Sequence, residues 1–230
     1  RNIWSFTVTA EDGVTTAVYT VTVNTAALPE PITPGVDNKK PASKPEVKLP
    51  FTDVSTSDWF YDDVAFVYKN GLFSGTDSRS FSPNASMTRA MLVTVLYRLE
   101  GEPTVTGRSS FTDVRSGAYY EKAVIWAAAN GIVTGTDSTS FSPDAKVTRE
   151  QLAAILYRYA QYRKLDTDAS AKLNSFTDAD SVSAYASEAL GWAVSEGLIN
   201  GASGKLMPKG DATRAQVAAI LHRLVKNVLN

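Results

Sequence analysis

Three arginines recur at matching places in the sequence and are the strongest candidates for binding chemistry. Each follows a threonine, in the pairs Thr88-Arg89, Thr148-Arg149 and Thr213-Arg214. Apolar residues at helical spacing come next, so each threonine is placed to cap a helix and each arginine to occupy its first position. The helix dipole disfavours a cation there, so the arginines need another reason. An arginine beside free backbone N–H groups makes an anion site, and an ion pair with a nearby aspartate is the alternative.

A recurring aspartate is the possible partner of these arginines and a candidate contact in its own right. Asp53, Asp113 and Asp178 each end a Phe-Thr-Asp triplet. They can form turns through side-chain bonds to the backbone, or they can accept hydrogen bonds from sugar hydroxyls. A second set of arginines lies further along the same helices, where a cation suits the C-terminal half without any ligand. These are Arg98, Arg158 and Arg223.

Two sets of aligned aromatic residues are the other candidates, because a flat ring can cover the apolar face of a sugar. Trp59 aligns with Tyr119 and Tyr185, and Phe66 aligns with Trp126 and Trp192. The second set falls within a helix and also fits the core, but Trp126 and Trp192 are retained as candidate carbohydrate contacts. The single histidine, His222, aligns with Tyr97 and Tyr157, which indicates packing or a surface position rather than catalysis.

The elements that position these residues form an internal repeat. Phe51-Thr52-Asp53-Val54 recurs at 111–114 and, with alanine last, at 176–179; the boundaries we expect are 51–107, 108–173 and 174–230. Each copy reads as helix, loop, helix, and the first helix stops at a glycine, Gly71, Gly131 or Gly197. The second helix has apolar residues at i, i+3, i+4 and i+7, as in Leu92, Val95, Leu96 and Leu99. Two short helices cannot bury such a stripe alone, so the copies should pack around a shared core.

The first fifty residues read differently. Residues 3–23 alternate in the manner of two strands around a Glu11-Asp12-Gly13 turn, which predicts a hairpin. A lone hairpin is marginal in water, so residues 1–25 are interpreted as the end of a β-sandwich, and they resemble the close of cadherin-like or bacterial Ig-like repeats. Residues 26–50 are rich in proline and lysine, which favours an extended linker.

Composition excludes several functions. The net charge of −1 gives no basic field for nucleic acid, and no apolar run approaches the roughly 20 residues of a membrane span. There is no cysteine, and no motif for phosphate binding, metal-dependent hydrolysis or a nucleophilic serine is present. We therefore expect a binding protein with no cofactor and no catalytic residue.

The recurring motifs together resemble S-layer homology domains over residues 51–230. They are Phe-Thr-Asp-Val, the loop from Gly75-Thr76-Asp77 to Phe81-Ser82-Pro83, its copy at 135–143, and Thr-Arg-Ala. The resemblance implies a mainly α fold in which three helix-loop-helix repeats form a pseudo-threefold prism with grooves between them. It also implies an extracellular module that binds pyruvylated, hence anionic, secondary cell-wall polysaccharide and anchors a surface protein non-covalently to the wall of Gram-positive bacteria. The family's ligand-binding arginine corresponds to Arg89, Arg149 and Arg214.

Two alternatives stay open, a lattice-forming scaffold in place of a monomer, and the anchor of an enzyme whose catalytic domain lies upstream. The copies are also unequal. The family motif continues Thr-Arg-Ala-Glu, but Met91, Gln151 and Gln216 replace the glutamate, and Glu150 replaces the alanine. Capping boxes are thus complete only in the second and third copies, while the third keeps only Gly201 and Pro208 of the loop. Repeat two alone keeps both features, so we expect first a site that involves Arg149.

Overall fold

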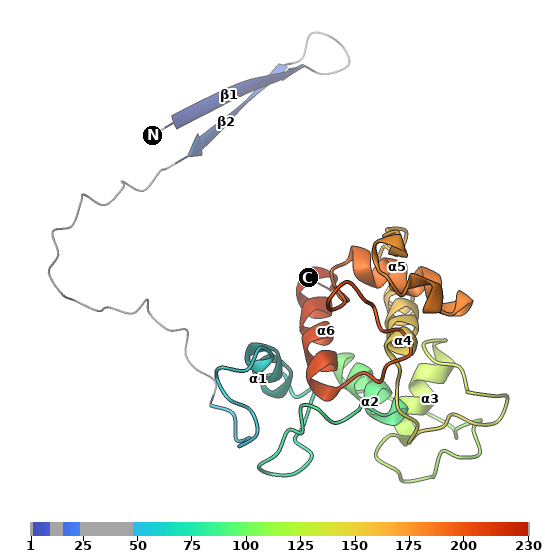
Figure 1. Cartoon of the computed structure of the whole chain (residues 1–230). Coiled ribbons are helices and arrows are strands. Elements are labelled where there is room, and N and C mark those ends of the chain that lie inside the picture. Colours follow the sequence, from blue (N-terminus) through green and yellow to red (C-terminus); the bar gives the residue numbers. More distant parts are fainter. Residues whose placement is uncertain (1, 10–15, 24–47, 230) are drawn as a thin grey trace, which may run out of the picture. The chain divides into compact units, whose positions relative to one another are not determined.

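The computed structural model describes residues 2–9, 16–23 and 48–229, and the chain divides into two units, residues 1–46 and 47–230 (Figure 1). In the first unit β1 (Asn2–Thr9) pairs antiparallel with β2 (Thr16–Val23), with Asn2 opposite Val23. The predicted hairpin is confirmed. The expected turn at 11–13 and most of the expected linker lie outside the described residues, and the β-sandwich assignment stays a prediction.

The second unit is helical, as the repeat pattern predicts. Each repeat supplies two α-helices to the described chain, the second starting at the recurring arginine. Repeat one holds α1 (Tyr61–Lys69) and α2 (Arg89–Leu99), and repeat two holds α3 (Glu121–Ala129) and α4 (Arg149–Tyr162). Repeat three holds the short 3-10 turns η1 (Leu173–Ser175), η2 (Ala179–Ser181) and η3 (Ala184–Ala186), then α5 (Ser187–Ser195) and α6 (Arg214–Asn227).

The second helices begin as their sequences predict. The side chain of Thr88 accepts a hydrogen bond from the backbone N–H of Met91, and Thr148 and Thr213 act in the same way on Gln151 and Gln216. The two glutamines bond back to the threonine N–H and complete capping boxes, whereas methionine cannot. The first helices end before glycines with positive φ, 67° at Gly71, 69° at Gly131 and 66° at Gly197, the left-handed conformation expected after a helix.

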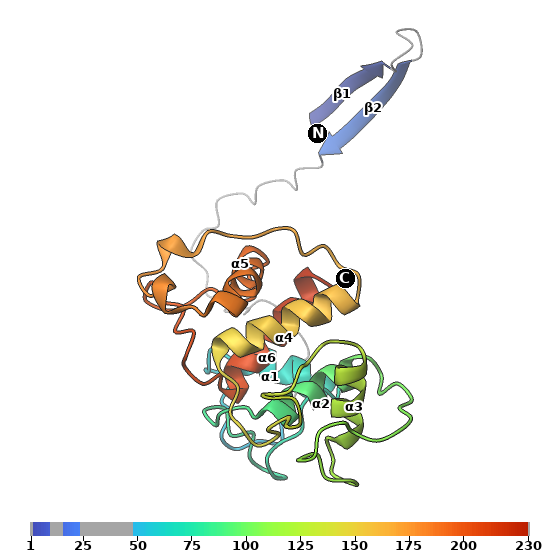
Figure 2. The same cartoon turned by 90° about the vertical axis from the view of Figure 1, so that its right-hand side faces the viewer.

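The helices pair between repeats. The first helix of each repeat packs against the second helix of the preceding one: α3 against α2, α5 against α4, and α1 against α6 (Figures 1 and 2). The last pair joins the two ends of the helical unit, so the contacts close into a cycle. The pseudo-threefold prism that the resemblance implies stays a prediction, but the order of contacts is cyclic.

A ring of backbone hydrogen bonds repeats this order just before the second helices. Met87 N–H donates to the Ala212 carbonyl at 2.9 Å, Ala212 N–H to Val147 at 2.8 Å, and Val147 N–H to Met87 at 2.9 Å. Each repeat therefore gives one donor and one acceptor to its neighbours. These bonds bring the starts of α2, α4 and α6 together.

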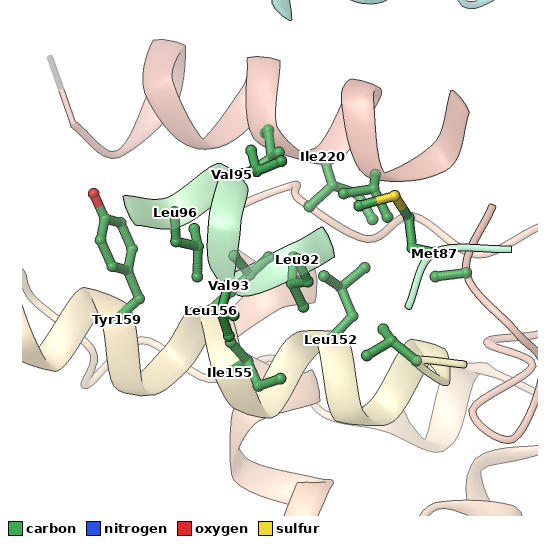
Figure 3. Close-up of a cluster of buried hydrophobic side chains, with 14 of the residues drawn as sticks. Met87, Leu92, Val93, Val95, Leu96, Leu152, Ile155, Leu156, Tyr159 and Ile220 are labelled. Carbon is green, nitrogen blue, oxygen red and sulfur yellow. The ribbon is translucent and has the colours of Figure 1, made fainter. Parts of the chain in front are cut away.

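One hydrophobic core is shared by all three repeats. Figure 3 shows side chains of α2 lying between α4 and α6, with Leu92 and Leu96 near Leu152 and Leu156, and Val95 near Ile220. The predicted apolar stripes face this core, and all their members are buried except Leu99, which is partly buried. The stripe of one helix is covered by helices of the other repeats, which confirms that a single repeat could not bury it.

Candidate functional site

A buried arginine at the start of each second helix reaches into the following repeat. Nε of Arg89 donates to the carbonyl of Phe141 at 2.8 Å, and a terminal nitrogen donates to that of Thr134 at 3.0 Å. The other two follow the same order: Arg214 donates to the carbonyls of Phe81 and Ser74, both at 2.7 Å, and Arg149 to that of Leu206 at 2.7 Å. Only 6 to 8% of each residue is exposed. These arginines therefore fasten one repeat to the next.

The backbone N–H groups beside these arginines are not free. The N–H of Arg89 donates to the Ala145 carbonyl and that of Ala90 to the Pro143 carbonyl, both at 2.9 Å. The N–H of Met91, the third in the helix, donates to the side chain of Thr88. The same bonds recur at the starts of α4 and α6. The expectation of free N–H groups beside the arginines is therefore wrong, because the loop of the next repeat accepts their hydrogen bonds. Contact between the arginines themselves and an anionic ligand stays a prediction.

The three aspartates hold the same loop from its other side. The two carboxylate oxygens of Asp113 accept hydrogen bonds from the backbone N–H groups of Phe141 at 2.8 Å and Ser142 at 2.7 Å. Asp53 and Asp178 bind the equivalent N–H pairs. In the described chain no ion pair joins these aspartates to the arginines. Asp113 and Arg89 are instead linked through the backbone of Phe141, whose N–H donates to Asp113 and whose carbonyl accepts from Arg89. A role in binding sugar hydroxyls stays a prediction for all three.

Three grooves lie beside the arginines, and we number them by the repeat that forms the floor. Groove 1 has a volume of about 410 Å³, groove 2 about 420 Å³ and groove 3 about 210 Å³. Each floor consists of the second helix and the loop before it. Each groove also takes its buried arginine from the preceding repeat and an exposed aromatic from the following one: Arg214 and Tyr119 in groove 1, Arg89 and Tyr185 in groove 2, Arg149 and Trp59 in groove 3. Every groove is thus built by all three repeats.

The aromatic residues at the grooves are not the tryptophans selected from the sequence. Trp59, Tyr119 and Tyr185 are 65%, 64% and 56% exposed, whereas Trp126 and Trp192 are 4% and 0% exposed. The prediction that Trp126 and Trp192 contact carbohydrate is wrong, because a buried ring offers no face to a sugar. The alignment of Trp59 with two tyrosines just ahead of the first helix was the signal that could have identified the correct set.

The aromatic residues inside the first helices form contacts between repeats. Trp126 packs on Tyr97, with ring centroids 5.7 Å apart, and Phe66 stacks on His222 at 4.2 Å. His222 also bonds Asp63 at 2.8 Å, which links α6 to α1. The expectation of a packing or surface role for the histidine is confirmed.

The second set of arginines also lines the grooves, and its members differ in their partners. Arg98 donates to the carbonyl of Leu72 and Arg223 to that of Leu198, both at 3.1 Å. For Arg158 in groove 2, no hydrogen bond or ion pair is found within the described part of the chain. Burial, and after it the charge of Arg158, lowers the pKa of Arg89, as expected for two cations at one groove. Groove 2 thus presents an arginine whose guanidinium has no hydrogen-bond acceptor or ion-pair partner among the described residues.

Neither a metal site nor a membrane-spanning helix is found in the described chain. Its single histidine and its acidic residues form no group that could hold a metal ion. None of its helices combines the length and apolar character needed to cross a membrane.

Helical repeats that share one core and build grooves at their junctions define a repeat-type binding module. The model of the S-layer homology domain matches residues 50–90, 110–153 and 175–218, more than half of the chain, and the chain belongs to this family. The residues between the helices, which build the grooves, fall largely inside the matched segments.

Relatives with this region include both enzymes and surface-layer proteins. The chain is 31% identical to an endoglucanase of Bacillus sp. (strain KSM-635) over 78% of its length, and 32% identical to the surface-layer 125 kDa protein of Lysinibacillus sphaericus over 69%. A cellulosome-anchoring protein of Acetivibrio thermocellus is 26% identical over 48%. The match spans only 19%, 13% and 26% of these relatives. The matched region is therefore a cell-surface anchoring module and not a catalytic domain.

Proposed function

We propose that the grooves bind a secondary cell-wall polysaccharide carrying pyruvate ketals, and thereby anchor a bacterial surface protein without a covalent bond. The observation that carries this proposal is that each groove joins a buried arginine from one neighbour to an exposed aromatic ring from the other. This pairing suits a ligand with a carboxylate beside an apolar sugar face.

The arginines keep donors for such a ligand. In the described chain, the fully buried side-chain nitrogen and oxygen atoms that lack a hydrogen-bond partner are the indole nitrogens of Trp126 and Trp192. The unbonded guanidinium nitrogens of the arginines are therefore in contact with solvent. A guanidinium and a carboxylate form short, charge-assisted hydrogen bonds, which are stronger than neutral ones.

Groove 2 is the site that we favour. The loop and capping glutamine that distinguish repeat two form its floor, and its buried arginine is Arg89, while Arg149 points to the smaller groove 3. The sequence-based preference for Arg149 rested on treating one repeat as one site. All three grooves are lined by a second arginine, but Arg98 and Arg223 each donate to a backbone carbonyl, whereas Arg158 makes no hydrogen bond or ion pair within the described residues. A carboxylate in groove 2 can therefore bind Arg158 without competing with a protein acceptor.

Arg158 is also the best residue for testing the proposal, because within the described residues it makes no hydrogen bond or ion pair that its loss would break. Arg158→Ala should weaken binding to purified pyruvylated wall polysaccharide about tenfold, the loss of one charged hydrogen bond, without lowering the melting temperature. Isothermal titration calorimetry measures the affinity. Arg115→Ala, at an exposed position outside the grooves, is the matched control.

Two results would contradict the proposal. Equal affinity for polymer with and without pyruvate would show that the pyruvate carboxylate is not recognised. Equal affinity of Arg158→Ala and Arg115→Ala would remove groove 2 as the main site.

The relatives favour a compatible second proposal, that the module anchors a longer protein, either an enzyme or a surface-layer protein. The endoglucanase and the surface-layer protein that match have most of their length outside the matched region. The complete gene sequence tests this directly. For lattice self-assembly, the remaining alternative, light scattering is the test, since a persistent monomer at high concentration would contradict it.

The hairpin carries a proposal of its own. We infer that β1 and β2 are the last strands of a cadherin-like or bacterial Ig-like β-sandwich, since a two-stranded sheet is marginal in water. Upstream sequence with no further strands of alternating pattern would contradict this.

A further inference from the structure

Glu150 is a buried carboxylate that its sister repeats lack. It occupies the second position of α4, where α2 and α6 have Ala90 and Ala215, and its side chain is 5% exposed. A helix start favours an acid, but burying a carboxylate is costly unless it is paired and hydrogen-bonded. Its partners therefore indicate what it does.

All the partners of Glu150 lie in repeat three. The carboxylate accepts hydrogen bonds from the backbone N–H of Ser183 at 3.0 Å, the Ser183 hydroxyl at 2.9 Å and the Tyr185 hydroxyl at 3.1 Å. Lys209 pairs with it at 2.7 Å and also contacts the Ser183 hydroxyl. Burial alone raises the pKa of Glu150, but the bonds from Lys209, Ser183 and Tyr185 outweigh it and hold the pKa below its usual range. The carboxylate thus stays charged and binds residues 183–185, the segment that contains Tyr185, the aromatic residue of groove 2.

The equivalent aromatics of the other grooves are held differently. Trp59 packs edge-to-face on the next residue, Phe60, with centroids 5.3 Å apart, and Tyr119 packs in the same way on Tyr120 at 5.0 Å. The residue after Tyr185 is Ala186, which has no ring to offer. Tyr185 therefore has no neighbouring ring in repeat three to pack against. Its hydroxyl donates instead to the carboxylate of Glu150, which belongs to repeat two.

We propose that Glu150 is a positioning residue that holds Tyr185 at groove 2 and replaces the aromatic neighbour present in the other two repeats. Its effect on affinity rests on the proposed function of the groove. Because the ring is already fixed before the ligand binds, less conformational entropy is lost on binding, and the affinity is higher. Lys209 neutralises the carboxylate, so Glu150 can hold the ring without repelling an anionic polymer.

The first test needs no ligand. In Glu150→Ala, which restores the residue of the sister repeats, amide hydrogen exchange of residues 182–186 should quicken at least about tenfold while α4 and α5 keep their protection. Glu150→Gln, which still accepts from Ser183 and Tyr185, should recover part of that protection. Unchanged exchange in Glu150→Ala would overturn the proposal.

The second test measures groove 2 by itself, in a chain from which the exposed aromatics of grooves 3 and 1 are removed by Trp59→Ala and Tyr119→Ala. Glu150→Ala and Tyr185→Phe should each weaken binding to pyruvylated wall polysaccharide several-fold. The double variant should be no weaker than Glu150→Ala, because both changes break the same bond. If Glu150 acts independently of the Tyr185 hydroxyl, the losses of affinity in the two single variants should instead add in the double variant, and this result would overturn the proposal.

The outcomes separate the two proposals. Faster exchange with unchanged affinity, in a background where Arg158→Ala still weakens binding, would overturn the role of Glu150 in recognition. Absence of polymer binding by every variant and by the unaltered chain would overturn the proposed function, and hydrogen exchange would still decide whether Glu150 positions Tyr185.

Discussion

A guanidinium at the first turn of a helix needs acceptors, since neither the helix dipole nor the core favours it there. Arg214 meets this need with the carbonyls of Phe81 and Ser74, more than a hundred residues away in sequence. Its guanidinium also lies over the ring of Phe81, with the guanidinium carbon 4.6 Å from the ring centroid. The residue thus joins repeat three to repeat one and lines groove 1 at the same time.

This double role predicts a loss of stability when the side chain is removed. Arg214→Ala should lower the free energy of unfolding by about 2–3 kcal/mol, because one buried and one partly buried carbonyl lose a charged donor. Urea unfolding followed by circular dichroism measures the change, and Arg115→Ala should stay within about 0.5 kcal/mol of the unaltered chain. If Arg214→Ala proves equally harmless, the bonds to repeat one are not what holds the junction.

At the scale of single residues, side-chain chemistry was predictable and exposure was not. The recurring arginines were identified from their place beside a capping threonine, and all three line grooves. Trp126 and Trp192 were misassigned because a sequence shows which residues share a helix face but not which neighbour covers it. Arg158 was set aside for a similar reason, since its sister Arg98 has a carbonyl partner and it has none in the described chain.

Among the elements, the second helices show how local sequence sets stability. α4 and α6 have complete capping boxes, while in α2 the side chain of Met91 cannot bond back, and no acceptor is found in the described chain for the N–H of Thr88. Met91→Gln should complete the box and stabilise the protein by about 0.5–1 kcal/mol, the worth of one hydrogen bond.

Chemical denaturation tests this prediction, with Gln151→Met as the reverse change in α4. The two substitutions should shift the midpoint in opposite directions by similar amounts. A stabilisation by methionine at 151, or a destabilisation by glutamine at 91, would show that packing around these side chains outweighs the cap.

At the scale of the whole helical unit, the cyclic order of contacts makes the repeats interdependent. Each first helix lies on the second helix of the preceding repeat, and α1 against α6 completes the cycle. We therefore expect residues 48–229 to unfold in one cooperative transition, with equal calorimetric and van't Hoff enthalpies. Scanning calorimetry measures both, and separate transitions for the repeats would contradict the shared core.

The sequence by itself determined the repeats, the starts and ends of their helices and the stripes that face the core. These features depend on interactions within a few turns of chain, such as a threonine cap, a glycine with positive φ, or apolar residues at helical spacing. Only the tertiary structure decided how a groove is composed. An arginine, a loop and an aromatic from three different repeats meet because helices pair with those of neighbouring repeats. For that reason the loop of repeat two works with Arg89 and Tyr185, and Glu150 of repeat two supports a ring that repeat three supplies.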